Sequence, residues 1–146
     1  MSKKFVHLHV HSEYSLLDGL SNLSKMLTHV KENGMDTIAL TDHGVMYGII
    51  DFYKQALKQG GKPIIGMEAY LAFERMSDKR PRIDSQYYHL TLLAKNMEGY
   101  RNLMLLSSKS YLEGFYYKPR IDKELLAKHH EGIIALSGCL HSEISK

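Results

Sequence analysis

The residues of this sequence best suited to chemistry are histidines, carboxylates and a cysteine at or near the ends of short apolar runs. They are His9, His11, Asp18, His43, Glu68, His89 and Cys139. Imidazole, carboxylate and thiolate together suit zinc, manganese or iron, because magnesium and calcium prefer oxygen ligands. Several histidines mixed with carboxylates that can bridge favour a cluster of two or more divalent ions, with zinc the first choice. Such clusters bind phosphate esters, activate water and stabilise the leaving oxygen.

Spacing supports some of these roles and leaves others open. His9 and His11 are two residues apart, so on a strand their side chains point the same way. They can bind one ion together, or each can bind one of two neighbouring ions. His7 lies on the same face, two residues before His9, and is expected either to orient a ligand or to pack against its neighbours. Asp42 either orients its neighbour or caps a turn, and a buried Cys139 could equally serve packing alone.

The elements expected to position these side chains alternate between strands and helices. Strands are predicted over residues 6–11, 37–40, 63–71, 88–94 and 133–136. Apolar stripes with helical spacing begin near Leu23, Ile49 and Tyr100, and Asp122 can cap a fourth helix. The polar stretch 74–86 is predicted to be a surface loop.

This alternation predicts an α/β fold with a parallel sheet and right-handed crossovers, either a barrel or an open sheet. In a parallel barrel the carboxyl ends of the strands form one rim, so all seven candidates would converge there. The pattern stops after five strands, too few to close an eight-stranded barrel. We therefore expect one domain, truncated after the first part of a barrel.

Composition sets broad limits on the chain. Its 146 residues, 44% hydrophobic and 24% charged, suit one globular domain with a real core. A net charge of +3 permits an anionic partner without requiring one, and a single cysteine excludes an intrachain disulfide. No apolar run approaches membrane-spanning length, so we expect no membrane contact and a cytoplasmic location.

A basic and aromatic segment lies outside the predicted ligand set. Lys118 and Arg120 follow three aromatic residues at 115–117. Such a segment can contact a nucleic-acid backbone or base, or it can be a solvated loop packed on its own domain. The sequence leaves both interpretations open.

Several motifs resemble the polymerase and histidinol phosphatase (PHP) superfamily. They are His-Leu-His-Val-His-Ser at residues 7–12, Thr-Asp-His-Gly at 41–44, Gly-Met-Glu at 66–68 and the later His89. The resemblance implies a distorted seven-stranded β/α barrel with a trinuclear metal centre. It implies metal roles for His9, His11, Asp18, His43, Glu68 and His89, with Cys139 where other members often carry histidine. The family commonly has aspartate in place of His7, so the resemblance carries no ligand role to His7.

Longer segments narrow the resemblance. Residues 14–19, 89–94, 114–122 and 135–139 are similar to the N-terminal PHP domains of bacterial replicative DNA polymerases. This implies DNA as a partner, further polymerase domains in the parent chain, and possible contact with a proofreading exonuclease subunit and the replisome. The family's last ligands come from a downstream Asp-x-His motif that this sequence lacks, which predicts an incomplete centre.

Three hypotheses for function follow from the resemblance and the ligand set. The first is the PHP domain of a DNA-directed DNA polymerase, itself a metal-dependent phosphoesterase and potentially a 3′–5′ proofreading exonuclease. The second is a metal-stabilised structural module that docks a proofreading subunit. The third is a stand-alone small-molecule phosphatase, against which the polymerase-like segments argue.

Overall fold

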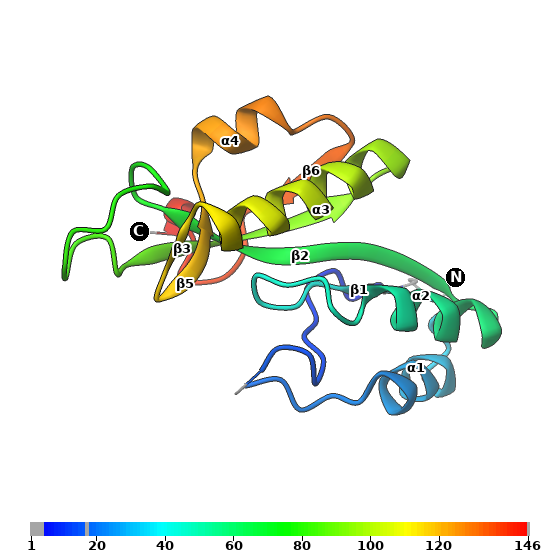
Figure 1. The fold of residues 1–146 in the computed structure, drawn as a ribbon. Coiled ribbons are helices and arrows are strands. Elements are labelled where there is room, and N and C mark those ends of the chain that lie inside the picture. The colour runs from blue at the N-terminus through cyan, green and yellow to red at the C-terminus, as the bar shows by residue number, and fades with distance from the viewer. Residues whose placement is uncertain (1–4, 17, 146) are drawn as a thin grey trace.

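The computed structural model describes residues 5–16 and 18–145 (Figure 1). Its elements are α1 (Leu23–Glu32), β1 (Thr37–Leu40), α2 (Ile49–Lys58), β2 (Lys62–Ala72), β3 (Tyr87–Ala94), α3 (Met97–Leu112), β4 (Phe115–Tyr116), β5 (Lys118–Ile121), α4 (Lys123–Lys128), β6 (Ile133–Leu136) and a short 3-10 helix at Glu143–Ser145. Leu17, within one of the quoted motifs, lies outside the described residues. None of the described helices has the length and apolar character to span a membrane.

Three of the four α-helices, α1, α3 and α4, begin where a polar side chain accepts from a free backbone amide. Asn22 accepts from the Lys25 amide before α1, Asn96 from Gly99 before α3, and Asp122 from Leu125 before α4. Each bond satisfies one of the donors that the first helical turn leaves unpaired. The four helices predicted from the apolar stripes and the Asp122 cap are all present, so that prediction is confirmed.

The sheet is built around β2, which pairs on both edges. The first part of β2 pairs in parallel with β1, and its far end pairs in parallel with β5. The opposite edge pairs antiparallel with β3, which pairs antiparallel with β6. The α/β class, with parallel pairs in the sheet, is confirmed.

The expectation of parallel pairing throughout the sheet is wrong. No helix lies between β2 and β3, where residues 73–86 form turns and irregular backbone. An antiparallel pair needs only a loop, whereas a parallel pair needs a crossover that is usually helical. The short β4–β5 hairpin, also antiparallel, was not predicted.

The first predicted strand is irregular. His7 makes one isolated parallel bridge to Ile38, and the carbonyls of His7 and Val10 accept from the amides of Ala39 and Thr41, both at 2.8 Å. The acceptors are three residues apart while the donors are two apart. The segment therefore follows β1 with one extra residue, as in a β-bulge, which ends regular pairing and redirects the following side chains.

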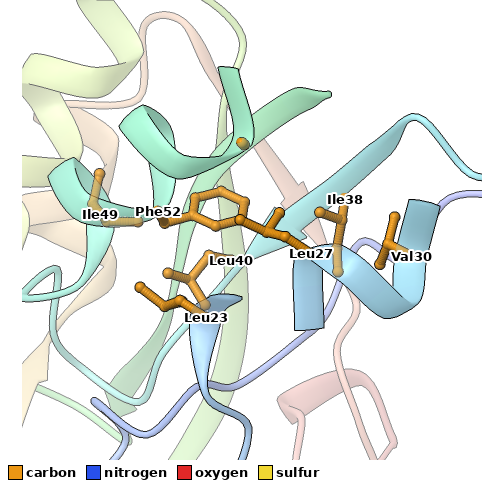
Figure 2. Packing of buried hydrophobic residues seen from close by; sticks show 8 residues of the cluster. Leu23, Leu27, Val30, Ile38, Leu40, Ile49 and Phe52 are labelled. Atoms are coloured by element: carbon orange, nitrogen blue, oxygen red, sulfur yellow. The ribbon is translucent and has the colours of Figure 1, made fainter. Parts of the chain in front are cut away.

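Two hydrophobic cores lie on either side of β2. Figure 1 shows α1 and α2 on one side of this strand and α3 and α4 on the other. The first core packs α1, β1 and α2 together, with Phe52 of α2 fully buried in the same cluster as Leu40 of β1 and Leu27 of α1 (Figure 2). The second core joins β2, β3, β5, α3 and α4. The packing of these two cores fixes the position of β2 and therefore the position of Glu68 within it.

Candidate metal centre

The predicted ligands converge on the Glu68 carboxylate. Its Oε1 atom lies 3.1 Å from His9 Nε2 and 3.0 Å from His89 Nδ1. Its Oε2 atom lies 2.9 Å from His11 Nε2 and 2.8 Å from His43 Nδ1. Each oxygen of this buried carboxylate therefore faces two imidazole nitrogens. Five of the seven side chains singled out from the sequence share one site.

Strand pairing explains how residues distant in sequence meet there. His43 follows β1 and forms an isolated parallel bridge with Glu68 in β2. On the other edge of β2, Glu68 is opposite Thr91 and Tyr70 is opposite His89. Residues two apart on a strand share a face, so His89 is a diagonal neighbour of Glu68 on the same side of the sheet. The irregular N-terminal segment adds His9 and His11 from beside β1.

The contacts fit a shared ion better than hydrogen bonding alone. His43 Nδ1 and Glu68 Oε2 are only 2.8 Å apart, yet neither buried atom has a partner in hydrogen-bond geometry among the described residues. The Nε2 atoms of His9 and His11 are 3.2 Å apart. Two nitrogens bound tetrahedrally to zinc at roughly 2.0–2.1 Å would be about 3.3 Å apart.

The cluster divides into two groups that could each hold a metal ion. One contains His9, His11 and Glu68, and the other contains His43, Glu68 and His89. Glu68 is common to both, as a bridging carboxylate would be. The residues present therefore fit bound divalent metal.

Electrostatics keep the central carboxylate ionised. Burial alone would raise the pKa of Glu68, but the surrounding imidazoles outweigh it and hold this pKa far below its ordinary range. Burial lowers the pKa of His43, but Glu68 and Asp18 outweigh that effect and raise it overall. A metal must displace a proton from any protonated imidazole before binding, so metal binding here competes with protons.

Asp18 and Cys139 lie at the rim of the cluster. Asp18 Oδ2 is 3.1 Å from His43 Nε2, on the side of the ring that faces away from Glu68. Cys139 Sγ lies 3.8 Å from His89 Nδ1 and accepts from the His141 amide at 3.4 Å. Both side chains are near enough to join the ligand set, and their ligand roles stay predictions.

Asp42 connects the loop that follows His11 to the backbone at His43. Its buried carboxylate accepts from the Ser12 amide at 2.6 Å, the Ser12 hydroxyl at 2.8 Å and the Ser15 hydroxyl at 2.7 Å. Ser15 Oγ in turn accepts from the His43 amide at 3.1 Å. This geometry favours the orienting role over a simple turn cap.

His7 does not join this arrangement. Its exposed ring meets Phe5 edge-on, with 4.8 Å between ring centroids, and makes no contact with the ligand cluster among the described residues. The structure therefore gives no support for an orienting role, and the exposed His7 ring packs only against Phe5 among the described residues.

The nucleic-acid contact that the sequence left open for Arg120 is not supported by its position. Its side chain is only 1% exposed. Its guanidinium donates to the carbonyls of Asp84 at 2.7 Å, Asp78 at 2.8 Å, Met76 at 2.9 Å and Gly114 at 3.2 Å. Arg120 therefore anchors the loop between β2 and β3, and its donors are consumed inside the protein. Lys118 remains a candidate because it lines a hollow that His43 and Asp18 also line.

Replacing Arg120 with methionine should lower the free energy of unfolding by about 3 kcal/mol, because four carbonyls lose their donor while the apolar stem is retained. Urea unfolding measures this change. Arg101→Met, at an exposed position of α3, is the matched control and should change stability by less than about 0.5 kcal/mol. Equal midpoints for Arg120→Met and wild type would contradict the anchoring role.

Sequence reasoning missed three residues near the cluster. Ser12 and Ser15 connect Asp42 to the ligand loop, and their only sequence signal is a position within two quoted motifs, residues 7–12 for Ser12 and residues 14–19 for Ser15. His141 belongs to none of the motifs quoted from the sequence. It is exposed, yet its ring lies 5.7 Å from that of His89 and its carbonyl accepts from the His89 amide at 3.0 Å.

Comparison with known proteins identifies the family. The family model described as "PHP domain" matches residues 7–146. The chain belongs to the PHP domain family. The resemblance read from the motifs is therefore confirmed.

Relatives of this PHP domain are much longer proteins. It is 54% identical to the DNA polymerase III subunit alpha of Helicobacter pylori over 99% of its own length, and 53% identical to that of Thermus aquaticus over 97%. It spans only 12% of the length of each. A solved structure described as a metal-dependent phosphoesterase, from Bifidobacterium adolescentis, has a TM-score of 0.49 and 14% identity, and the match covers 74% of this chain and 35% of that one.

Proposed function

We propose that this PHP domain is the N-terminal part of a bacterial replicative DNA polymerase and is itself a metal-dependent phosphodiesterase. The observation that carries the proposal is the Glu68 carboxylate, each oxygen of which faces two imidazole nitrogens. Identity above 50% to polymerase subunits over nearly the whole chain supports the parent protein. We also propose that the parent protein is cytoplasmic and that the remaining polymerase domains belong to the same chain.

Zinc is the metal we propose first, with manganese and iron as alternatives. Nitrogen and carboxylate donors with a nearby thiol suit these ions better than magnesium or calcium. Divalent metal at such a site supplies a nucleophile from water and stabilises charge on phosphoryl oxygens.

Side chains of this chain would bind the metal, position the ligands and contact the substrate. His9, His11, His43 and His89 would hold metal together with Glu68, and Asp42 keeps the loop of His11 in place through Ser12. Asp18 is mostly exposed at the mouth, 3.1 Å from His43 Nε2, where it can ligate or accept a proton. Lys118 lines the same hollow as Asp18 and His43, and its ammonium can attract the phosphate of a substrate.

The substrate we propose is single-stranded DNA, cleaved from its 3′ end. The test measures bound metal by elemental mass spectrometry and hydrolysis of a 3′-labelled oligonucleotide by the 146-residue chain. His43→Ala should lose hydrolysis by about 100-fold or more, because it removes one ligand and the partner of Asp18. His130→Ala, an exposed histidine, should leave both metal and activity unchanged.

Three other outcomes would redirect the proposal. Hydrolysis of phosphomonoesters but not of DNA would favour a small-molecule phosphatase. Bound metal without any hydrolysis would favour a structural module, and binding of a proofreading subunit should then be tested. A folded chain without metal or hydrolysis would contradict the proposal for this chain.

A further inference from the structure

A hollow of about 240 Å³ opens directly beside the metal cluster, with His43 and Asp18 in its wall. Its aromatic lining consists of Tyr14, Tyr47, Tyr70, Tyr111, Phe115 and Tyr117. Pockets that enclose a drug-sized ligand measure roughly 300–1,000 Å³. This hollow therefore suits a single ring system attached to a group that reaches the cluster, rather than a whole substrate.

Several of these rings are exposed although each is large. Tyr117 is 70% exposed, Tyr47 59% and Phe115 48%. Single exposed aromatics are ordinary, but a group gathered around one hollow marks a binding surface. Rings of this kind provide flat faces on which a nucleic-acid base can stack.

Tyr117 has an unusual backbone conformation. It is the turn residue of the β4–β5 hairpin, where Tyr116 pairs with Lys118, and its φ is 61°. Bulky residues rarely adopt positive φ, and such positions gather at functional sites. Glycine or asparagine would fit this turn with less strain. A tyrosine here therefore indicates a use for the ring, which lines the hollow.

Lys118 supplies a positive charge in the wall of the hollow, which His43 and Asp18 also line. Its Nζ lies 5.4 Å from the centre of the Tyr70 ring, and its charge acts on His43. Among residues 5–16 and 18–145, no carboxylate lies within ion-pair distance of it. An ammonium that no acidic side chain neutralises is well placed to contact a phosphate.

We propose that this hollow binds the terminal nucleotide of a single-stranded nucleic acid, with the base stacked on Tyr117 and Tyr47 and an adjacent phosphate at Lys118. The inference rests on the proposed function, because it assigns the part of the substrate that lies next to the bond being cleaved. Stacking accepts any base, so the hollow should hold a terminal nucleotide with little sequence preference.

The test uses an oligothymidylate that carries 2-aminopurine at its 3′ end, since stacking quenches the fluorescence of this base. Binding is titrated in EDTA, where no metal-dependent cleavage occurs, and hydrolysis is followed separately with zinc or manganese. The 146-residue chain should quench the probe. Tyr117→Gly, which suits the positive φ while removing the ring, should weaken binding about 10-fold, and Tyr117→Phe should restore it.

Two further variants keep the test independent of the hairpin. Tyr47→Ala should also weaken binding, and Lys118→Met should reduce the dependence of affinity on salt by about 0.7 in the logarithmic slope, one phosphate contact on a single strand. Tyr53→Ala and Lys58→Met, exposed residues of α2, are the matched controls and should bind like wild type.

Absence of quenching by wild type, or equal binding by wild type, Tyr117→Gly and Tyr47→Ala, would overturn the inference even if DNA is hydrolysed. Quenching that depends on Tyr117 and Tyr47 would support it even if no hydrolysis is found. Failure of the nucleotide site and failure of the proposed hydrolysis are thus separate results.

Discussion

Glu68→Gln is expected to deprive the chain of bound metal, with affinity falling by about 100-fold or more. Loss of a residue that only orients a ligand already lowers metal affinity about 10- to 100-fold, and Glu68 is shared by both ligand groups. Glutamine keeps the size of the side chain but removes its charge. Its amide would also direct a nitrogen toward two imidazoles where an oxygen now lies.

The measurement is metal content after gel filtration, together with competition against a chromogenic chelator. Glu74→Gln is the matched control, because the Glu74 carboxylate lies in the loop after β2 and pairs only with Arg80 at 3.0 Å among the described residues. That variant should retain wild-type metal. Equal metal content in Glu68→Gln and wild type would show that the carboxylate is not a ligand, whatever its position.

The convergence of ligands was predictable because it depends on local patterns. His9 and His11 alternate along an apolar run, and His43 follows a short buried strand, so each pattern is visible within a few residues. The sequence correctly predicted that these side chains lie close together, but the strand arrangement on which the prediction was based is partly wrong. Glu68 and His89 meet across an antiparallel pair, as diagonal neighbours on one face, and not at the carboxyl ends of two parallel strands.

The role of Arg120 was not predictable from its neighbourhood in the sequence. It follows three aromatic residues and a lysine, a pattern typical of an exposed basic patch. Its burial depends on the Asp84 and Met76 carbonyls, which lie 36 and 44 residues away in the chain. Acceptors of this kind are backbone atoms, so no residue type in the loop indicates them.

The antiparallel β2–β3 pair was within reach of sequence reasoning. Residues 74–86 contain Pro81 and no helical stripe, which already indicates a loop rather than a crossover helix. The irregular first segment was not within reach. The extra residue between His7 and Val10 is set by pairing with β1, and a period of two in the sequence gives no sign of it.

Asp42→Ala is expected to lower the free energy of unfolding by about 4 kcal/mol. The carboxylate accepts three hydrogen bonds of 2.6–2.8 Å from Ser12 and Ser15 in a buried setting. Hydrogen bonds to a charged group contribute about 1.5–3 kcal/mol each, and the donors left behind would be buried without a partner. At about 2–4 °C for each kcal/mol in a chain of this size, the melting temperature should fall by roughly 10 °C.

The same substitution should weaken metal binding at temperatures where the variant is folded. Ser15 joins Asp42 to the His43 amide and Ser12 follows His11, so the loss frees the backbone on both sides of the cluster. Asp51→Ala is the matched control, since this exposed carboxylate of α2 accepts from Gln55 at the surface and should contribute less than about 0.5 kcal/mol. If Asp42→Ala lost stability but bound metal like wild type, Asp42 would be a structural anchor that does not position the ligands.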